Sequence, residues 1–170
     1  MSADSPRYFG EGQRYGGFAI GAGWFPIIES LIRQIDSYTK WKRNGRAYEL
    51  RIMRAKAKGR DAVLKFVCKG RQQRTWDEER VDDIMVDDNI VQTEKVEWIR
   101  VAQIKEKFGG LRFYYDGGDD RIEGMVTMAE IWAGHTCETC GNKGKRRDGG
   151  WIRTLCDHHE ELHQSKLKGE

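Results

Sequence analysis

The strongest constraint on this 170-residue chain is a set of cysteine and histidine residues near its C-terminus. The chain contains four cysteines, and three of them fall within twenty residues. Cys137 and Cys140 form a Cys-x-x-Cys-Gly pair, and fifteen residues separate this pair from Cys156-x-x-His159. Four thiolate and imidazole donors at this spacing suit tetrahedral Zn²⁺. We therefore predict one structural Zn²⁺ bound by Cys137, Cys140, Cys156 and His159.

The surrounding residues predict the fold of a small metal-binding module. Asp148-Gly149 is a strong hairpin-turn dipeptide, and the second ligand pair opens a helical segment. The order of knuckle, hairpin and helix resembles the treble-clef zinc finger. Residues 135–168 are predicted to form this zinc-binding module, whose folding free energy comes largely from the metal. His158 and His163 are alternatives for the fourth ligand.

Apolar spacing predicts two helices before this module. A stripe of apolar residues at three- and four-residue intervals predicts a first helix that begins near Pro26 and ends at Asn44-Gly45. A second helix is expected to begin at Asp120, which can cap it, and to end at Gly134. The expected inward residues are Trp24, Ile27, Ile28, Leu31, Ile32, Ile35 and Tyr38 in the first helix, and Ile122, Met125, Val126, Ala129 and Trp132 in the second.

Two pairs of strand-like stretches lie between these helices. Residues 47–57 pair with 61–68 across a turn-like Lys-Gly-Arg, and residues 95–107 pair with 111–115 across Phe-Gly-Gly. We predict an antiparallel sheet of two hairpins packed on the two helices, so that residues 21–134 form an α+β core domain. The second hairpin is expected to contribute Ile99, Val101, Leu111, Phe113 and Tyr115 to the core.

Composition and termini exclude several classes of protein. Residues 1–20 are rich in glycine and lack apolar periodicity, which predicts a flexible lead-in. No apolar run approaches the roughly 18 residues of a membrane span, and the N-terminus does not resemble a secretory signal. Thiol ligands suit a reducing compartment, so we expect a cytoplasmic protein. Cys68 lies in an apolar stretch and is interpreted as a buried hydrophobic residue.

The net charge of +3 conceals a strong segregation of charge. Residues 40–74 carry thirteen Lys or Arg against two acids, and residues 77–94, expected as a loop or short helix, carry eight acids against Arg80. The basic stretch is typical of a surface that binds phosphates, unless the acidic segment folds back and neutralises it. The candidate contact residues for nucleic acid or another partner are Arg46, Arg51, Arg54, Lys56, Lys58, Lys105, Lys107, Arg112, Lys145, Arg146 and Arg147.

The second predicted hairpin combines these cations with aromatic residues. Phe108, Phe113 and Tyr114 stand among its Lys and Arg residues, a composition suited to stacking on bases or on a partner surface. The alternative is that Phe108 and Phe113 belong to the core while the charges are solvated.

The sequence contains few signs of catalysis. It has no Walker-type phosphate loop and no Gly-x-Ser-x-Gly elbow. Leu155-Cys-Asp-His-His159 resembles the ending of nucleases of the His-Asn-His type, but the histidine pair that would precede the module is missing. We therefore expect a binding protein without enzymatic activity, with a divergent nuclease as the less favoured alternative.

Several segments together resemble a known family. They are Gly21-Ala-Gly-Trp-Phe-Pro, Gln103-Ile-Lys-Glu-Lys-Phe-Gly-Gly-Leu-Arg-Phe-Tyr114, Met128-Ala-Glu130, Cys137-Glu-Thr-Cys-Gly and Gly150-Trp-Ile-Arg-Thr-Leu-Cys156. This set resembles a family of small proteins found in bacteriophages and prophage-bearing bacteria. The resemblance implies a phage-associated context and location in the host cytosol, and it brings no established activity. It adds one alternative function, that of a protein that binds and inhibits a host enzyme or defence complex.

Overall fold

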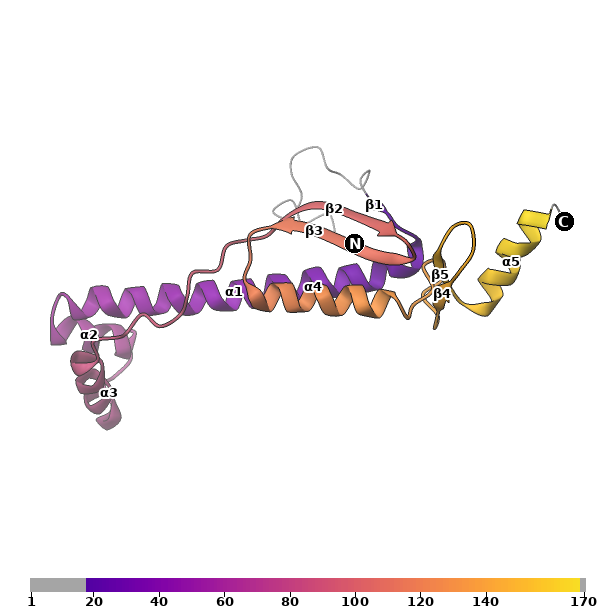
Figure 1. Cartoon of the computed structure of the whole chain (residues 1–170). Helices are drawn as coiled ribbons and strands as arrows, with labels where there is room; N and C mark the ends of the chain where they lie inside the picture. The colour runs from indigo at the N-terminus through magenta and orange to yellow at the C-terminus, as the bar shows by residue number, and fades with distance from the viewer. Residues whose placement is uncertain (1–17, 169–170) are drawn as a thin grey trace. The chain divides into compact units, whose positions relative to one another are not determined.

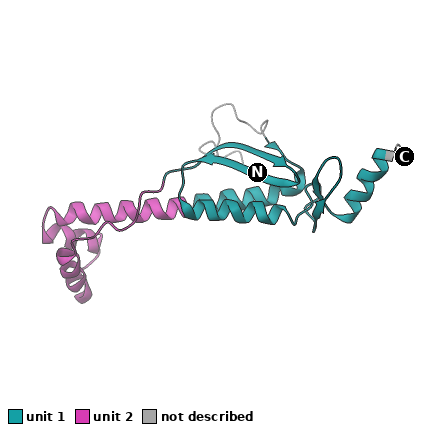
Figure 2. Cartoon of the chain, in the orientation of Figure 1, with its two compact units in different colours: residues 1–37, 97–170 teal, residues 38–96 magenta. Residues whose placement is uncertain are grey.

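The computed structural model describes residues 18–168, so most of the expected flexible lead-in, residues 1–20, lies outside the described residues. Within that range the chain is mixed α+β, with five α-helices, one short 3-10 helix and small sheets of three and two strands (Figure 1). It divides into two compact units (Figure 2). Unit 2 comprises residues 38–96, and unit 1 comprises the described residues on either side. Helix α1 (Phe25–Lys56) contributes residues to both.

Unit 1 contains the three-stranded sheet. Its order is β1 (Phe18–Ala19), β2 (Arg100–Lys107) and β3 (Gly110–Asp116), with β1 parallel to β2 and β2 antiparallel to β3. The pairing of Ile104 with Phe113, both buried, sets the register that turns one face of the sheet toward the core. The prediction of a hairpin in this part of the chain is confirmed.

The core of unit 1 lies between this sheet face and two helices. The first part of α1 and helix α4 (Asp120–Ala133) run along the same face of the sheet (Figure 1). The predicted apolar stripe is buried except for Tyr38, which is half-buried, and most of the core residues expected from the second hairpin are buried as well. The buried residues include Trp24 from the 3-10 helix η1 (Ala22–Trp24), Ile27, Ile28, Leu31, Ile32 and Ile35 from α1, Ile99, Val101, Leu111 and Phe113 from the hairpin, and Ile122, Val126, Ala129 and Ala133 from α4.

Helix α4 corrects two details of the sequence prediction. Its N-cap is Asp119, one residue earlier than expected, and the Asp119 side chain accepts a hydrogen bond from the Ile122 backbone N–H at 3.2 Å. Trp132, expected to face the core, is 60% exposed, because Ala133 takes the inward position one residue later. The helix ends before Gly134, as predicted.

The first predicted hairpin is wrong, because both of its stretches are helical. Helix α1 continues through Asn44-Gly45 to Lys56, and residues 61–68 fall within helix α2 (Arg60–Cys68). The expected turn is present, with a φ of 102° at Gly59, but it joins two helices. Since the sheet contains only the second hairpin, the predicted antiparallel sheet of two hairpins does not form within the described residues.

Helical spacing of the apolar residues explains this outcome. Ile52 and Ala55, three positions apart, are buried, as are Val63 and Val67, four positions apart. This is the period of a helix face, whereas a strand would bury alternate residues. The acidic stretch forms helix α3 (Thr75–Val86), which packs on α2. The core of unit 2 consists of Ala55, Val63, Val67 and Val81, with Ala62, Leu64, Phe66, Ile84 and Met85 around it.

A buried carboxylate fastens α3 to the end of α2. Asp77 is 1% exposed, and its two oxygens accept hydrogen bonds from Arg71 at 2.6 and 2.7 Å. The backbone N–H of Arg74 donates to Asp77 Oδ2 at 2.8 Å, which caps the first turn of α3. Hydrogen bonds from Arg71 hold the pKa of the Asp77 carboxyl well below its usual range.

This pairing predicts an acid-sensitive stability. The folded-state pKa of Asp77 lies below the unfolded value of about 3.9. Its contribution is therefore fully present above about pH 5 and is lost as the pH falls through the folded pKa. Asp77→Asn, which removes the charge, should lower the urea midpoint of unfolding at pH 7, measured by circular dichroism at 222 nm. The difference from the natural chain should shrink toward pH 2, and a constant difference would contradict this role.

Candidate metal centre and binding surfaces

The candidate metal ligands lie on three consecutive elements that follow α4. Cys137 and Cys140 belong to a tight turn in which the Gly141 N–H donates to the Cys137 carbonyl oxygen at 2.9 Å. The two-stranded sheet, β4 (Lys145–Arg147) paired antiparallel with β5 (Arg153–Leu155), then brings the chain back. Helix α5 (Asp157–Lys168) begins immediately afterwards, with His159 in its first turn. Asp148-Gly149 lies in the loop between the strands, as predicted.

The structure brings all four predicted ligands together. One ligand atom from each of Cys137, Cys140, Cys156 and His159 lies within 4.8 Å of the others. The Cys140 and Cys156 sulfurs are 3.8 Å apart, and His159 Nδ1 is 3.7 Å from Cys137 Sγ and 3.2 Å from Cys156 Sγ. Tetrahedral zinc with bonds of 2.0–2.3 Å separates its ligand atoms by about 3.5–3.8 Å. The cluster can therefore hold a metal ion, for which zinc is the typical choice.

The surroundings of the cluster favour thiolate at Cys137, whereas the pKa of the Cys140 thiol is raised, because the lowering effect of the Asn142 backbone is outweighed by burial and the neighbouring Cys137 and Cys156 sulfurs. Burial acts to raise the pKa of the Cys137 thiol, but backbone N–H groups near Cys156, Cys140 and Thr139 stabilise the thiolate, and the resulting pKa lies below its ordinary value. Thiolate is the form of cysteine that binds metal.

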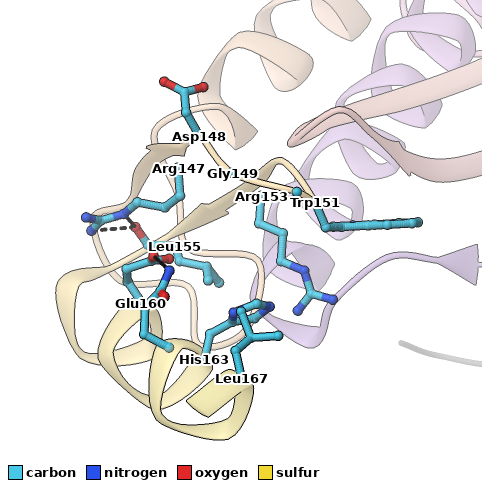
Figure 3. A pocket seen from close by; sticks show the side chains of 11 residues that line it. Arg147, Asp148, Gly149, Trp151, Arg153, Leu155, Glu160, His163 and Leu167 are labelled. Atoms are coloured by element: carbon cyan, nitrogen blue, oxygen red, sulfur yellow. Dashed lines mark hydrogen bonds between the residues drawn. The ribbon is translucent and has the colours of Figure 1, made fainter.

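The alternative histidines lie elsewhere. His158 is exposed, and His163 lines a pocket of about 390 Å³ between the β4–β5 hairpin and α5 (Figure 3). Of the histidines in the described residues, only His159 joins the cysteine cluster. Trp151 and Leu167 contribute apolar surface to the pocket, and Glu160 and Gln164 are hydrogen-bonded to each other at its wall.

The segment that precedes α1 packs directly against the cysteine turn. The Gly23 N–H donates to the Glu138 carbonyl oxygen at 2.8 Å, and Trp24 Nε1 donates to the Thr136 carbonyl oxygen at 2.7 Å. A Cβ at Gly23 would lie 2.2 Å from the Cys137 carbonyl oxygen, closer than atoms can approach. The glycine at position 23 is therefore required by the close approach of two backbones.

The turn between β2 and β3 packs on the other side of the module. The Thr154 hydroxyl donates to the Gly109 carbonyl oxygen at 2.6 Å, and the Glu138 N–H donates to the Thr154 carbonyl oxygen at 2.9 Å. Gly109 has a φ of 77°, and a Cβ there would lie 3.2 Å from the Arg153 backbone. Two glycine-containing segments of the sequence thus hold the cysteine turn and β5 against the rest of unit 1.

The cations of the β4–β5 hairpin are paired within the module. Lys145 and Arg147 both reach the Asp157 carboxylate, at 3.3 and 2.6 Å. Hydrogen bonds from Arg147 and Lys145 lower the pKa of Asp157. Arg146 lies 3.9 Å from Asp148. These three cations are therefore balanced locally.

The predicted basic residues of unit 2 fall into two groups. Arg46 donates to the Thr93 carbonyl oxygen, and Lys56 contacts the Asp87 carbonyl oxygen and the Asp88 carboxylate. Arg51, Arg54 and Lys58 are exposed, and none of them has an acidic partner among the described residues. Residues that are close together in the sequence therefore differ in their surroundings: Arg46 and Lys56 are paired, whereas Arg51, Arg54 and Lys58 are not.

Trp132, expected to face the core, is exposed on the outer side of α4, on the same helix face as the exposed Met128 and Ile131. Trp151 is exposed in the β4–β5 loop. Apolar periodicity alone cannot distinguish such a face from a core face. Among the described residues, no helix combines the length and apolar character that a membrane crossing requires.

The chain matches no protein-family model, and no curated protein or solved structure is significantly similar to it.

The close approach at Gly23 gives a sharp prediction. Gly23→Ala should lower the free energy of unfolding by about 2–3 kcal/mol, because an added methyl group meets backbone that is fixed by the cysteine turn. The measurement is urea unfolding followed by circular dichroism.

Gly124→Ala is the matched control. Gly124 lies in α4 with no atom within 4 Å of the added Cβ, so this variant should gain about 0.5–1 kcal/mol from helix propensity. Equal behaviour of the two variants would show that the contact at Gly23 does not constrain the fold.

Proposed function

We propose that this chain is a zinc-stabilised, non-enzymatic protein that binds nucleic acid through a basic face of helix α1. The observation that carries the proposal is that Arg51 and Arg54, both exposed on α1, have no acidic partner among the described residues. A phage-associated setting and location in the host cytosol belong to the same proposal, and they rest on the family resemblance of the sequence.

The metal would serve the fold. Four protein donors fill a tetrahedral site, leaving no position for a reactive water. The succession of cysteine turn, β4–β5 hairpin and α5 supports a treble-clef-like module. Zinc bound by Cys137, Cys140, Cys156 and His159 would join the start of the module to its final helix.

Arg51 and Arg54 of α1 form what we term the basic stripe. At 100° per residue these two positions lie about 60° apart on the helix circumference. The acid nearest to them in sequence, Glu49, lies on the opposite side of α1, where it accepts hydrogen bonds from Thr93. Lys58 follows the stripe in the turn after the helix.

The acidic segment accounts for other cations. Arg60 pairs with Glu78 and Asp82, and Arg71 with Asp77. These pairs lie at the α2–α3 contact, whereas Arg51 and Arg54 are exposed to solvent without such a partner. Two uncompensated arginines three residues apart on a rigid helix suit contacts to neighbouring phosphates.

Metal content tests the zinc assignment. The purified chain should contain about one equivalent of zinc, and Cys156→Ser should lose most of it, because a thiolate ligand is removed. Cys68→Ser changes the one cysteine outside the cluster, at the end of α2, and this variant should retain the zinc. Elemental analysis after dialysis measures both. Retention of zinc in Cys156→Ser, or loss of zinc in His163→Ala comparable to that in His159→Ala, would contradict the ligand set.

Salt dependence tests the nucleic-acid proposal. Fluorescence anisotropy with a labelled 20-base-pair duplex should give log affinity that falls linearly with log salt. Each phosphate contact adds about 0.9 to the slope. Arg51→Gln/Arg54→Gln should therefore reduce the magnitude of the slope by about 1.8. Lys65→Gln/Lys166→Gln, which removes the same charge from α2 and α5, should leave the slope unchanged.

Two outcomes would favour the alternatives. A salt-insensitive complex with a host protein, captured from lysate pretreated with nuclease and lost on Arg51→Gln/Arg54→Gln, would favour the protein-inhibitor function. Mg²⁺-dependent cutting of plasmid that disappears in His158→Ala would favour the divergent nuclease. Equal slopes for the stripe and control variants would remove the basic stripe from the interface.

A further inference from the structure

The outward face of the β2–β3 hairpin has a different composition from the basic stripe. Alternation places Gln103, Lys105 and Lys107 of β2 and Arg112 and Tyr114 of β3 on the side away from the core. Among the described residues of these two strands, the acid on this side is Asp116, which lies opposite Arg100 at the end of the hairpin away from the tip. Arg112 Nη1 lies 3.6 Å from Glu130 Oε2, so the lysines are the cations with the greater freedom.

The tip of this hairpin contains a residue that its backbone does not favour. Phe108 and Gly109 have consecutive positive φ values of 53° and 77°, the pattern of a type I′ turn. Asn-Gly is the preferred pair in such turns, and a bulky residue with positive φ is an outlier. Glycine suits position 109, because it tolerates the positive φ and leaves room for the Arg153 backbone. Phenylalanine at position 108 has no such explanation.

Core packing does not explain Phe108 either. Its side chain is 65% exposed, whereas Phe113 on the neighbouring strand is buried. Of the two interpretations of these aromatics, the core one therefore holds for Phe113 alone. A strained backbone that presents an exposed aromatic ring at a hairpin tip is the kind of outlier that points to a binding role.

Each exposed ring on this hairpin has a lysine beside it. Lys107 Nζ lies 5.5 Å from the centre of the Phe108 ring, and Lys105 Nζ lies 5.0 Å from the centre of the Tyr114 ring. Tyr114 is also exposed. An aromatic ring paired with an ammonium group can receive one nucleotide, with the base on the ring and the phosphate on the lysine.

We propose that the β2–β3 hairpin binds unpaired nucleotides, with Phe108 and Tyr114 stacking on bases and Lys105 and Lys107 contacting the backbone phosphates. This proposal rests on nucleic acid being the partner, and it names single-stranded nucleic acid as the ligand of unit 1. Duplex nucleic acid, whose bases are stacked on each other, offers no free base face to Phe108.

The test uses the full-length, zinc-loaded chain with Phe108→Asn. Asparagine suits the positive φ, so the melting temperature should not fall. Affinity for a labelled dT20 oligonucleotide should fall about tenfold, the loss expected for one stacked base, while affinity for the 20-base-pair duplex should be unchanged. Phe108→Trp, which keeps an aromatic ring at this position, should bind dT20 as tightly as the natural chain does. An rU20 arm determines whether DNA and RNA strands share the site.

Trp132→Gln is the matched control, because it removes an exposed aromatic from the outer side of α4. It should leave dT20 affinity unchanged. Lys107→Gln should reduce the salt slope for dT20 by about 0.7.

Three outcomes would overturn the proposal. They are unchanged dT20 affinity in Phe108→Asn, equal losses for dT20 and the duplex, and a lower melting temperature that accounts for the loss. If Phe108→Asn changes nothing while Arg51→Gln/Arg54→Gln weakens both ligands, the basic stripe stands and this inference alone fails. If neither ligand binds the natural chain, the proposed function fails with it.

Discussion

The arrangement of unit 1 depends on a backbone contact at the cysteine turn. Gly23 lies so close to Cys137 and Gly141 that no side chain fits between the two segments, and hydrogen bonds join them on both sides of the contact. A metal ion held by Cys137 would make that turn rigid, because the same residue is both ligand and packing partner. The start of α1 is thereby fixed to the module at the other end of the chain.

Two glycine-containing segments that are far apart in the sequence both pack against the metal-binding module. One begins at Gly21 and leads into α1, and the other forms the β2–β3 turn at Gly109. Both touch the module, the first at the cysteine turn and the second at β5. Thr154 links these contacts, since its backbone bonds to Glu138 and its hydroxyl bonds to Gly109. The module is therefore part of the unit 1 core.

The candidate metal site could be predicted from the sequence because ligand chemistry and spacing are local properties. The second hairpin could be predicted too, because its inward residues alternate around a Phe-Gly-Gly turn. The first hairpin could not, since residues 47–57 mix arginines with apolar residues in a way that fits either period. There the three-residue spacing of the buried Ile52 and Ala55 fits the helix, and Ala55 packs in one cluster with Val63 and Val67 of α2. Local sequence cannot report such contacts.

The distribution of charge also could not be predicted from the sequence alone. A sum over residues 40–74 counts thirteen cations as one block, but helix geometry divides them. Arg60 and Arg71 turn toward carboxylates on α3, while Arg51 and Arg54 project from α1 without an acid on their side. The acidic segment therefore pairs with cations near the α2–α3 contact, whereas the basic stripe stays exposed to solvent. The proposed phosphate binding therefore rests on which cations a neighbouring helix does not reach, a property of the fold that the net charge of +3 does not reveal.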